Sequence, residues 1–115
     1  MTVAFSSSRT MLRDGLGLVE VSGEVDIYTA PRFKDDLVAI VDEGAIDVVV
    51  DLSRVDFIDS TALGVLIGGI KRLHPLGGRL ALVAATRPVT RVLDITGLAK
   101  VFAVHPTREE AVASF

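Results

Sequence analysis

Hydrophobic positions along the chain follow two different periods. Three nearly continuous apolar runs, Ile46 to Leu52, Leu80 to Val83 and Val101 to Val104, are typical of buried strands. In the segments between them, apolar residues recur every three or four positions, as they do in helices that pack one face on a core. Strands that alternate with helices in this way predict an α/β sheet with helical cover.

Capping residues mark where the predicted helices begin and end. The first helix is expected to start at Thr29-Ala30-Pro31 and to end near Gly44, because proline is tolerated in the first turn and glycine favours the C-cap. A later helix starts at Thr86-Arg87-Pro88 and stops at Gly97. Thr107-Arg108-Glu109-Glu110 matches a capping box, so a final helix is expected to run to the C-terminus.

A hairpin is predicted near the N-terminus. Residues 2–9 form a short candidate strand, in which Ser6 to Ser8 fit a sheet edge, and Leu16 to Val21 form a stronger one. Arg13-Asp14-Gly15 between them is a turn signal. The chain shows no internal repeat, linker or low-complexity segment, so residues 1–115 are expected to form a single domain.

The segment that follows the central apolar run contains a cluster of helix-capping side chains. Asp59, Ser60 and Thr61 all favour the N-cap, where a side-chain oxygen accepts a hydrogen bond from a free backbone N–H. Ser60 is therefore expected at the N-terminal mouth of a helix, near its positive dipole end. Such a position can hold a phosphate.

The helix after Ser60 is unusual on its outer face. Its core stripe is expected to consist of Leu63, Leu66, Ile70 and Leu73. The opposite face carries Ser60, Thr61, Gly64, Val65, Gly68 and Gly69, with Lys71 and Arg72 in the last turn. Each glycine costs a helix about 0.5–1 kcal/mol relative to alanine, so close approach of another surface is implied. That surface is either a neighbouring element of the chain or a partner, and the flat face leading away from a hydroxyl favours a partner.

Composition and charge remove several classes of function. The formal net charge is −3, so the chain lacks the basic field that collects nucleic acid or anionic lipid. It contains no cysteine, which excludes disulfides, thiolate metal sites and thiol catalysis. No apolar run reaches the roughly 18 residues of a membrane span, and the N-terminus lacks the pattern of a signal peptide. We therefore expect a soluble, cytoplasmic protein.

Four aspartates are candidate chemical groups: Asp26, Asp51, Asp56 and Asp59. All are predicted near strand ends, where open α/β sheets bind ligands and where paired carboxylates could act as acid and base or hold a metal. Caps and turns are the stronger interpretation, because no histidine, cysteine or lysine is placed to complete a catalytic constellation. Nor does a glycine-rich phosphate loop follow a strand. We expect no catalytic residue, no metal and no cofactor.

Ser60 has two interpretations. It is either part of a helix cap only, or a phosphorylation switch. A phosphate would add about −1.5 to −2 charge at a helix N-terminus, where the dipole and free N–H groups tolerate it. The fold would then survive, and the added charge beside Asp59 and Asp56 would repel a docked partner. This blocking role of the phosphate is a hypothesis.

Several motifs, in the order in which they occur along the chain, resemble those of a known family. They are Gly23-Glu24-Val25-Asp26 with Ala30, Val50-Asp51-Leu52-Ser53 followed by Val55, Phe57 to Leu66, Gly77-Gly78-Arg79-Leu80, and Leu93 to Leu98. From about Leu16 to its end, the chain resembles the STAS domain family, specifically the bacterial anti-sigma factor antagonists. The resemblance implies a four- or five-stranded mixed β-sheet flanked by about four helices, and no catalytic activity.

The resemblance also implies partner switching. An unphosphorylated antagonist binds an anti-sigma factor that is itself a serine kinase, and the sigma factor is released. The kinase phosphorylates the antagonist, and a metal-dependent serine/threonine phosphatase restores it. In this sequence the matching acceptor is Ser60, with Thr61 as a second hydroxyl where relatives commonly have serine. The implied partner-binding residues are Asp26, Asp59, Ser60, Thr61, Gly64, Val65 and Gly68.

Other functional classes remain open at this point. A STAS-like chain can also be an interaction subunit of a stress-sensing or lipid-transport complex without phosphoswitching, and the glycine–valine face could pair two copies. An aspartate-dyad enzyme is weaker. A phospho-acceptor receiver domain needs a lysine after its last strand, but here His105-Pro106 follows that strand and Lys100 precedes it.

Overall fold

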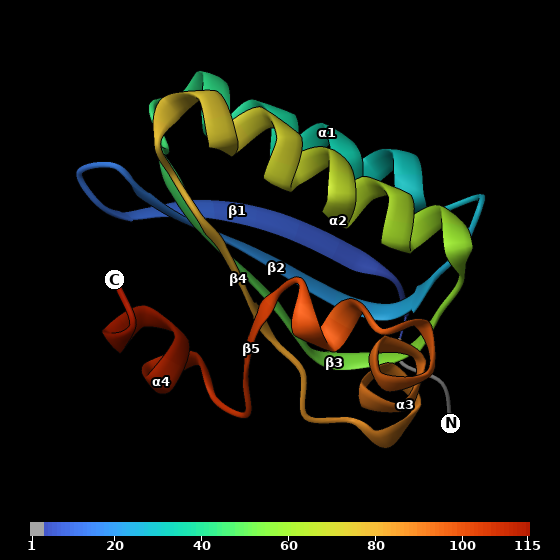
Figure 1. Ribbon diagram of the computed structural model, residues 1–115. Coiled ribbons are helices and arrows are strands. Elements are labelled where there is room, and N and C mark those ends of the chain that lie inside the picture. Colours follow the sequence, from blue (N-terminus) through green and yellow to red (C-terminus); the bar gives the residue numbers. More distant parts are fainter. Residues whose placement is uncertain (1–3) are drawn as a thin grey trace.

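The elements of the fold alternate along the chain as the hydrophobic pattern predicts. The computed structural model describes residues 4–115. Its strands are β1 (Ser6–Arg13), β2 (Leu16–Val25), β3 (Asp47–Ile58), β4 (Leu80–Val83) and β5 (Ala103–His105). Its α-helices are α1 (Ala30–Asp42), α2 (Ser60–Leu73), α3 (Arg87–Thr96) and α4 (Arg108–Ala113), as Figure 1 shows. Short 3₁₀ helices lie at His74–Leu76 and Leu98–Lys100.

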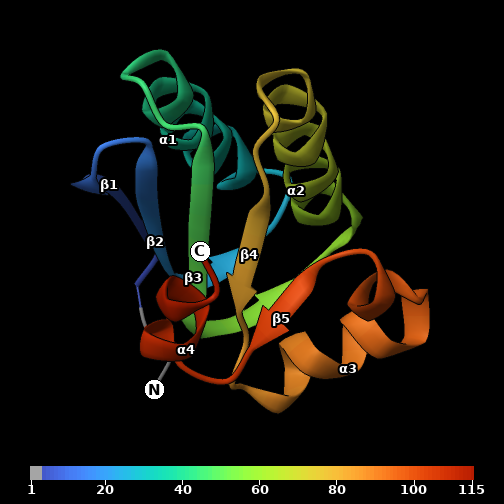
Figure 2. The same cartoon turned by 60° about the vertical axis from the view of Figure 1, so that its left-hand side comes forward.

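The sheet is mixed and has the order β1-β2-β3-β4-β5. β1 is antiparallel to β2, whereas β2, β3, β4 and β5 run parallel to their neighbours. Helices α1 and α2 lie side by side over one face, and α4 packs on the other (Figure 2). The expected α/β fold with a five-stranded mixed sheet and four α-helices is therefore confirmed.

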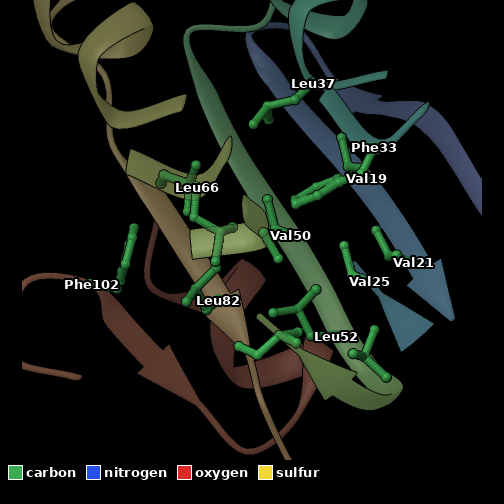
Figure 3. Packing of buried hydrophobic residues seen from close by; sticks show 14 of the residues in the cluster. Val19, Val21, Val25, Phe33, Leu37, Val50, Leu52, Leu66, Leu82 and Phe102 are labelled. Atoms are coloured by element: carbon green, nitrogen blue, oxygen red, sulfur yellow. The ribbon is translucent and has the colours of Figure 1, made fainter. Parts of the chain in front are cut away.

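Strand β3 runs through the core along its whole length and is longer than predicted. Toward α1 and α2 it contributes, in order, Val48, Val50, Leu52, Val55 and Ile58, part of the cluster in Figure 3. The spacing changes from two to three after Leu52, and the register with β2 shifts between Glu20 and Ser22 and again between Gly23 and Glu24. These irregularities let polar residues interrupt the strand without moving its apolar side chains out of the core. The prediction that the strand ends at Leu52 was wrong for this reason.

Other boundaries also moved. β1 begins at Ser6, because Ala4 and Phe5 belong to no strand, and residues 2 and 3 of the predicted strand lie outside the described part. Ser6 to Ser8 do lie on the edge strand. β5 begins at Ala103, because the exposed Val101 belongs to the turn after a 3₁₀ helix. His105, expected directly after the last strand, is the final residue of β5.

The predicted ends of α1 and α3 are confirmed. Gly44 follows the C-cap of α1 with a φ of +112°, and Gly97 is the C-cap of α3 with a φ of +76°. Thr107 Oγ1 accepts a hydrogen bond from Glu110 N at 3.2 Å, so α4 has its predicted N-cap. The helix ends at Ala113, so the prediction that it runs to the C-terminus was wrong.

The glycines of α2 divide into two kinds. A Cβ on Gly69 would lie 2.8 Å from Leu37 Cδ2 and 2.9 Å from Leu80 Cδ1, so Gly69 packs inside the chain. A Cβ on Gly64 or Gly68 would meet nothing within 4 Å. Gly69 was expected on the outer face and is instead buried, in an inner stripe that consists of Ala62, Leu63, Leu66, Gly69 and Leu73. Ile70, assigned to that stripe, is only half-buried.

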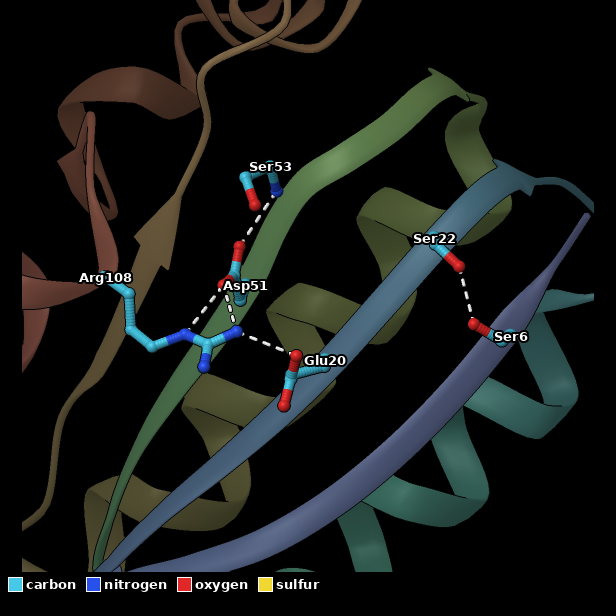
Figure 4. Close-up of polar contacts among 6 residues, drawn as sticks. All are labelled: Ser6, Glu20, Ser22, Asp51, Ser53 and Arg108. Atoms are coloured by element: carbon cyan, nitrogen blue, oxygen red, sulfur yellow. Dashed lines mark hydrogen bonds and ion pairs between the residues drawn. The ribbon is translucent and has the colours of Figure 1, made fainter. Parts of the chain in front are cut away.

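Helix α4 is held to the sheet by an ion-pair cluster. Arg108 Nε donates to Asp51 Oδ2 at 2.9 Å, and Arg108 Nη2 donates to Glu20 Oε2 at 2.7 Å (Figure 4). Asp51 is only 5% exposed, and its Oδ1 accepts from Ser53 N at 2.9 Å. The hydrogen bond to Asp51 raises the pKa of Arg108 above its ordinary value, so the guanidinium keeps its charge.

Replacing Arg108 by alanine should therefore destabilise the domain. It leaves the Asp51 carboxylate buried without its cation, and we expect the free energy of unfolding to fall by about 1–3 kcal/mol. Urea denaturation followed by far-UV circular dichroism measures this. Arg91→Ala is the matched control, because Arg91 is exposed on α3 and forms no ion pair with residues 4–115. Equal losses in the two variants would contradict a stabilising role for the cluster.

Alanine substitutions should change the free energy of unfolding in one direction at Gly64 and Gly68 and in the other direction at Gly69. Gly64→Ala and Gly68→Ala should each raise the free energy of unfolding by about 0.5–1 kcal/mol, because alanine favours the helix and meets no neighbour. Gly69→Ala should lower it by about 1–3 kcal/mol, because the new methyl group must displace the buried Leu37 side chain. The same denaturation experiment tests all three, and a stabilising Gly69→Ala would contradict the packing.

Candidate functional site

The carboxyl ends of β2 and β3 bring two loops together. Val25 pairs with Ile58 in the parallel ladder, and Asp59 N donates to Val25 O at 3.3 Å. Asp26 and Asp59, the next residues on each strand, therefore leave the sheet side by side. The first loop leads into α1 and the second directly into α2.

Of the three candidate N-cap residues, Asp59, Ser60 and Thr61, only Asp59 caps α2. Its backbone is extended, and its Oδ1 accepts hydrogen bonds from Thr61 N at 2.9 Å and Ala62 N at 3.1 Å. Ser60 is the first residue of α2 and is exposed, and its hydroxyl makes no hydrogen bond to any residue within 4–115. Thr61 is half-buried. The Ser60 hydroxyl is thus accessible at a positive helix end whose capping bonds come from another side chain.

Asp26 builds a rigid turn before α1. Its Oδ1 accepts from Tyr28 N at 2.9 Å and from Thr29 N at 3.1 Å. Thr29 Oγ1 in turn accepts from Asp26 N at 3.0 Å and donates to Glu24 O at 2.9 Å. These bonds give Asp26 a structural role, in agreement with the interpretation of the aspartates as turn and cap residues.

The Asp26 turn presents an apolar pair that the sequence analysis missed. Ile27 is 63% exposed and Tyr28 is 87% exposed. Large apolar side chains held outward by a fixed turn are typical of interaction surfaces. The available signal was an aliphatic and an aromatic residue between Asp26 and Thr29, in a segment that the hydrophobic pattern assigned to no strand or helix.

A groove runs between α1 and α2, starting next to this site, with a volume of about 760 Å³. On the α2 side it is lined by Thr61, Gly64, Val65 and Gly68, and at its far end by Lys71 and Arg72. Four of the expected partner-binding residues of α2 therefore face one depression, whereas Ser60 is not part of its lining. Their role in binding a partner remains a prediction.

The four aspartates do not form one constellation. Asp26 and Asp59 lie at the sheet edge described above, whereas Asp51 belongs to the cluster under α4. Asp56 has a buried Oδ1 without a hydrogen-bond partner in the described chain. Across residues 4–115, no group of three or more His, Cys, Asp or Glu side chains is arranged to hold a metal ion. None of the helices in that range is long and apolar enough to cross a membrane.

Known proteins are similar to this chain in sequence. The STAS domain model matches residues 9–111. An anti-sigma-B factor antagonist of Staphylococcus epidermidis is 36% identical over 100 residues, which cover 87% of this chain and 93% of that protein. The anti-sigma-B factor antagonist of Bacillus subtilis (strain 168) is 36% identical over 94 residues, or 82% of this chain and 85% of that protein.

A solved structure extends the likeness to three dimensions. The crystal structure of an anti-sigma factor antagonist from Mycobacterium paratuberculosis superposes with a TM-score of 0.86 at 32% identity, covering 96% of this chain and 93% of that one. The family match covers the strands and helices that build the candidate site, from β2 to α2. The chain therefore belongs to the STAS domain family.

Proposed function

We propose that this protein is an anti-sigma factor antagonist that acts by partner switching. In its unphosphorylated form it binds an anti-sigma factor serine kinase, and the sigma factor is set free. Phosphorylation of Ser60 blocks that binding. The observation that carries the proposal is the exposed Ser60 hydroxyl at the start of α2, beside an open face of the helix, in a chain whose relatives are named anti-sigma-B factor antagonists.

The geometry around Ser60 suits a reversible modification. In the proposed step, Ser60 Oγ attacks the γ-phosphorus of ATP, ADP leaves, and the hydroxyl proton passes to a base of the kinase. Asp59 already caps α2, so the hydroxyl carries no structural hydrogen bond that the reaction would break. The protein supplies only the acceptor and acts as no enzyme. A metal-dependent serine/threonine phosphatase would return the hydroxyl by hydrolysis.

Charge explains how the phosphate would block a partner. Asp59 and Asp26 already lie at this edge of the sheet, and the phosphate would add about −1.5 to −2 charge beside them. The helix dipole offsets part of this charge within the domain, which protects the fold. A partner packed closely on the same surface would have to bury it, at a cost of several kcal/mol.

Ser60 is a better acceptor than Thr61. Ser60 is exposed, whereas Thr61 is half-buried on the side of the groove. A kinase must reach the oxygen in line with the transferred phosphoryl group, which favours the exposed hydroxyl. Thr61 remains the second candidate acceptor. We propose that phosphorylation by the kinase and dephosphorylation by the phosphatase both take place in the cytoplasm.

The experiment uses each anti-sigma factor of the histidine-kinase-like type encoded in the same genome. Each purified kinase is mixed with this protein, and binding is measured by calorimetry and modification by intact mass with ATP. We expect one kinase to bind and to add one phosphate at Ser60. Ser60→Asp should lower the affinity at least tenfold while its unfolding midpoint stays close to that of the wild type.

Thr61→Ala is the matched control and should still be phosphorylated, whereas Ser60→Ala should bind the kinase but accept no phosphate. Ser60→Asp that melts the domain, or that binds as tightly as the wild type, would refute the switch. Kinase binding that is insensitive to Ser60→Asp and is never accompanied by phosphorylation would instead identify an interaction subunit without a switch.

A further inference from the structure

The groove between α1 and α2 extends well beyond the surface that the Ser60 switch needs. Its lining on α2 runs from Thr61 to Arg72, about 16 Å along the helix axis. A phosphate on Ser60 would lie next to the Thr61 end of this lining. The groove therefore offers a second contact area that the modification does not cover.

The floor of the groove is apolar and open. Leu37 and Val38 of α1 and Val65 of α2 line it, and Gly64 and Gly68 leave the α2 backbone accessible because a Cβ at either position would meet nothing within 4 Å. Gly69 has an internal packing reason, but Gly64 and Gly68 do not. A second helix, with its own ridge of side chains, could approach α2 closely along this line.

The far end of the groove is basic, against the net charge of the chain. Lys71 and Arg72 are exposed there, Lys34 lines the groove from the first turns of α1, and none of the three forms an ion pair with another residue of the described range. Asp35 is the acidic side chain that lines the groove. Because the whole protein has a formal net charge of −3, this local excess of cations selects a partner segment with carboxylates at the corresponding end.

We propose that the α1–α2 groove binds an acidic amphipathic helix of the anti-sigma factor. The apolar stripe of that helix lies on Val38, Val65 and the glycine backbone, and its carboxylates pair with Lys71 and Arg72. This inference rests on the proposed function and adds to it a docking contact separate from Ser60. The groove contributes affinity along α2, whereas the phosphate acts at the N-terminal end only.

Two groove variants test the proposal with the kinase that binds the wild-type protein. Gly68→Leu fills open space in the groove, and Lys71→Glu combined with Arg72→Glu reverses the charge at its end. We expect each variant to lower the affinity for the kinase at least tenfold. The charge reversal should also make this affinity less dependent on salt concentration. Arg87→Glu combined with Arg91→Glu on α3, outside the groove, is the matched control and should bind as the wild type does.

Controls separate the proposal from a folding defect and from the function it rests on. The groove variants should unfold at or above the midpoint of the wild type, and hydrogen exchange of the wild-type complex should show protection along α2 as far as Arg72. Groove variants that bind normally while Ser60→Asp does not would overturn the docking site and leave the switch standing. A wild-type protein that binds no kinase would instead refute the proposed function.

A second copy of the chain is the competing occupant of the α1–α2 groove. Sedimentation velocity of the isolated protein, with and without Gly68→Leu, measures it. A dimer that Gly68→Leu dissociates, together with unchanged kinase affinity, would assign the groove to a second copy of the chain and would overturn the proposal.

Discussion

Parallel pairing of β2 with β3, as far as Val25 and Ile58, determines where the candidate site lies. The pairing continues through two register shifts, so both strands reach the same edge although β3 carries extra residues. The core residues Val55 and Ile58 hold this irregular end of β3 against the helices. Without this extension, the Asp26 turn and the Asp59 cap would not be neighbours.

The site separates structural tasks from exposed chemistry. Asp26 and Asp59 use their carboxylates on backbone N–H groups, one before α1 and the other at the start of α2. Ser60 and Tyr28, which follow them closely in the chain, are left exposed. Asp26 and Asp59 thus satisfy backbone N–H groups at the ends of the helices, and the side chains of Ser60 and Tyr28 stay accessible.

Local signals predicted much of this molecule. Caps and turns, such as Pro31, Gly97 and Thr107, act over a few residues and could be recognised in the sequence. The length of β3 could not, because a bulge changes the spacing of apolar residues only where the partner strand allows it. Gly69 was misplaced for a related reason: the side chains that fill the space beside it come from two other elements, Leu37 of α1 and Leu80 of β4. The groove likewise exists only once α1 and α2 lie together.

The capping arrangement also has an evolutionary consequence. Since Asp59 makes the N-cap hydrogen bonds of α2, a substitution of Ser60 removes no cap hydrogen bond from the fold. Single nucleotide changes that exchange serine for another small residue there would leave a folded binding protein behind. Under the proposed switch, duplicated copies of such a gene could therefore diverge into regulated and permanently active forms through one codon, while the sheet and the helices stay under a common constraint.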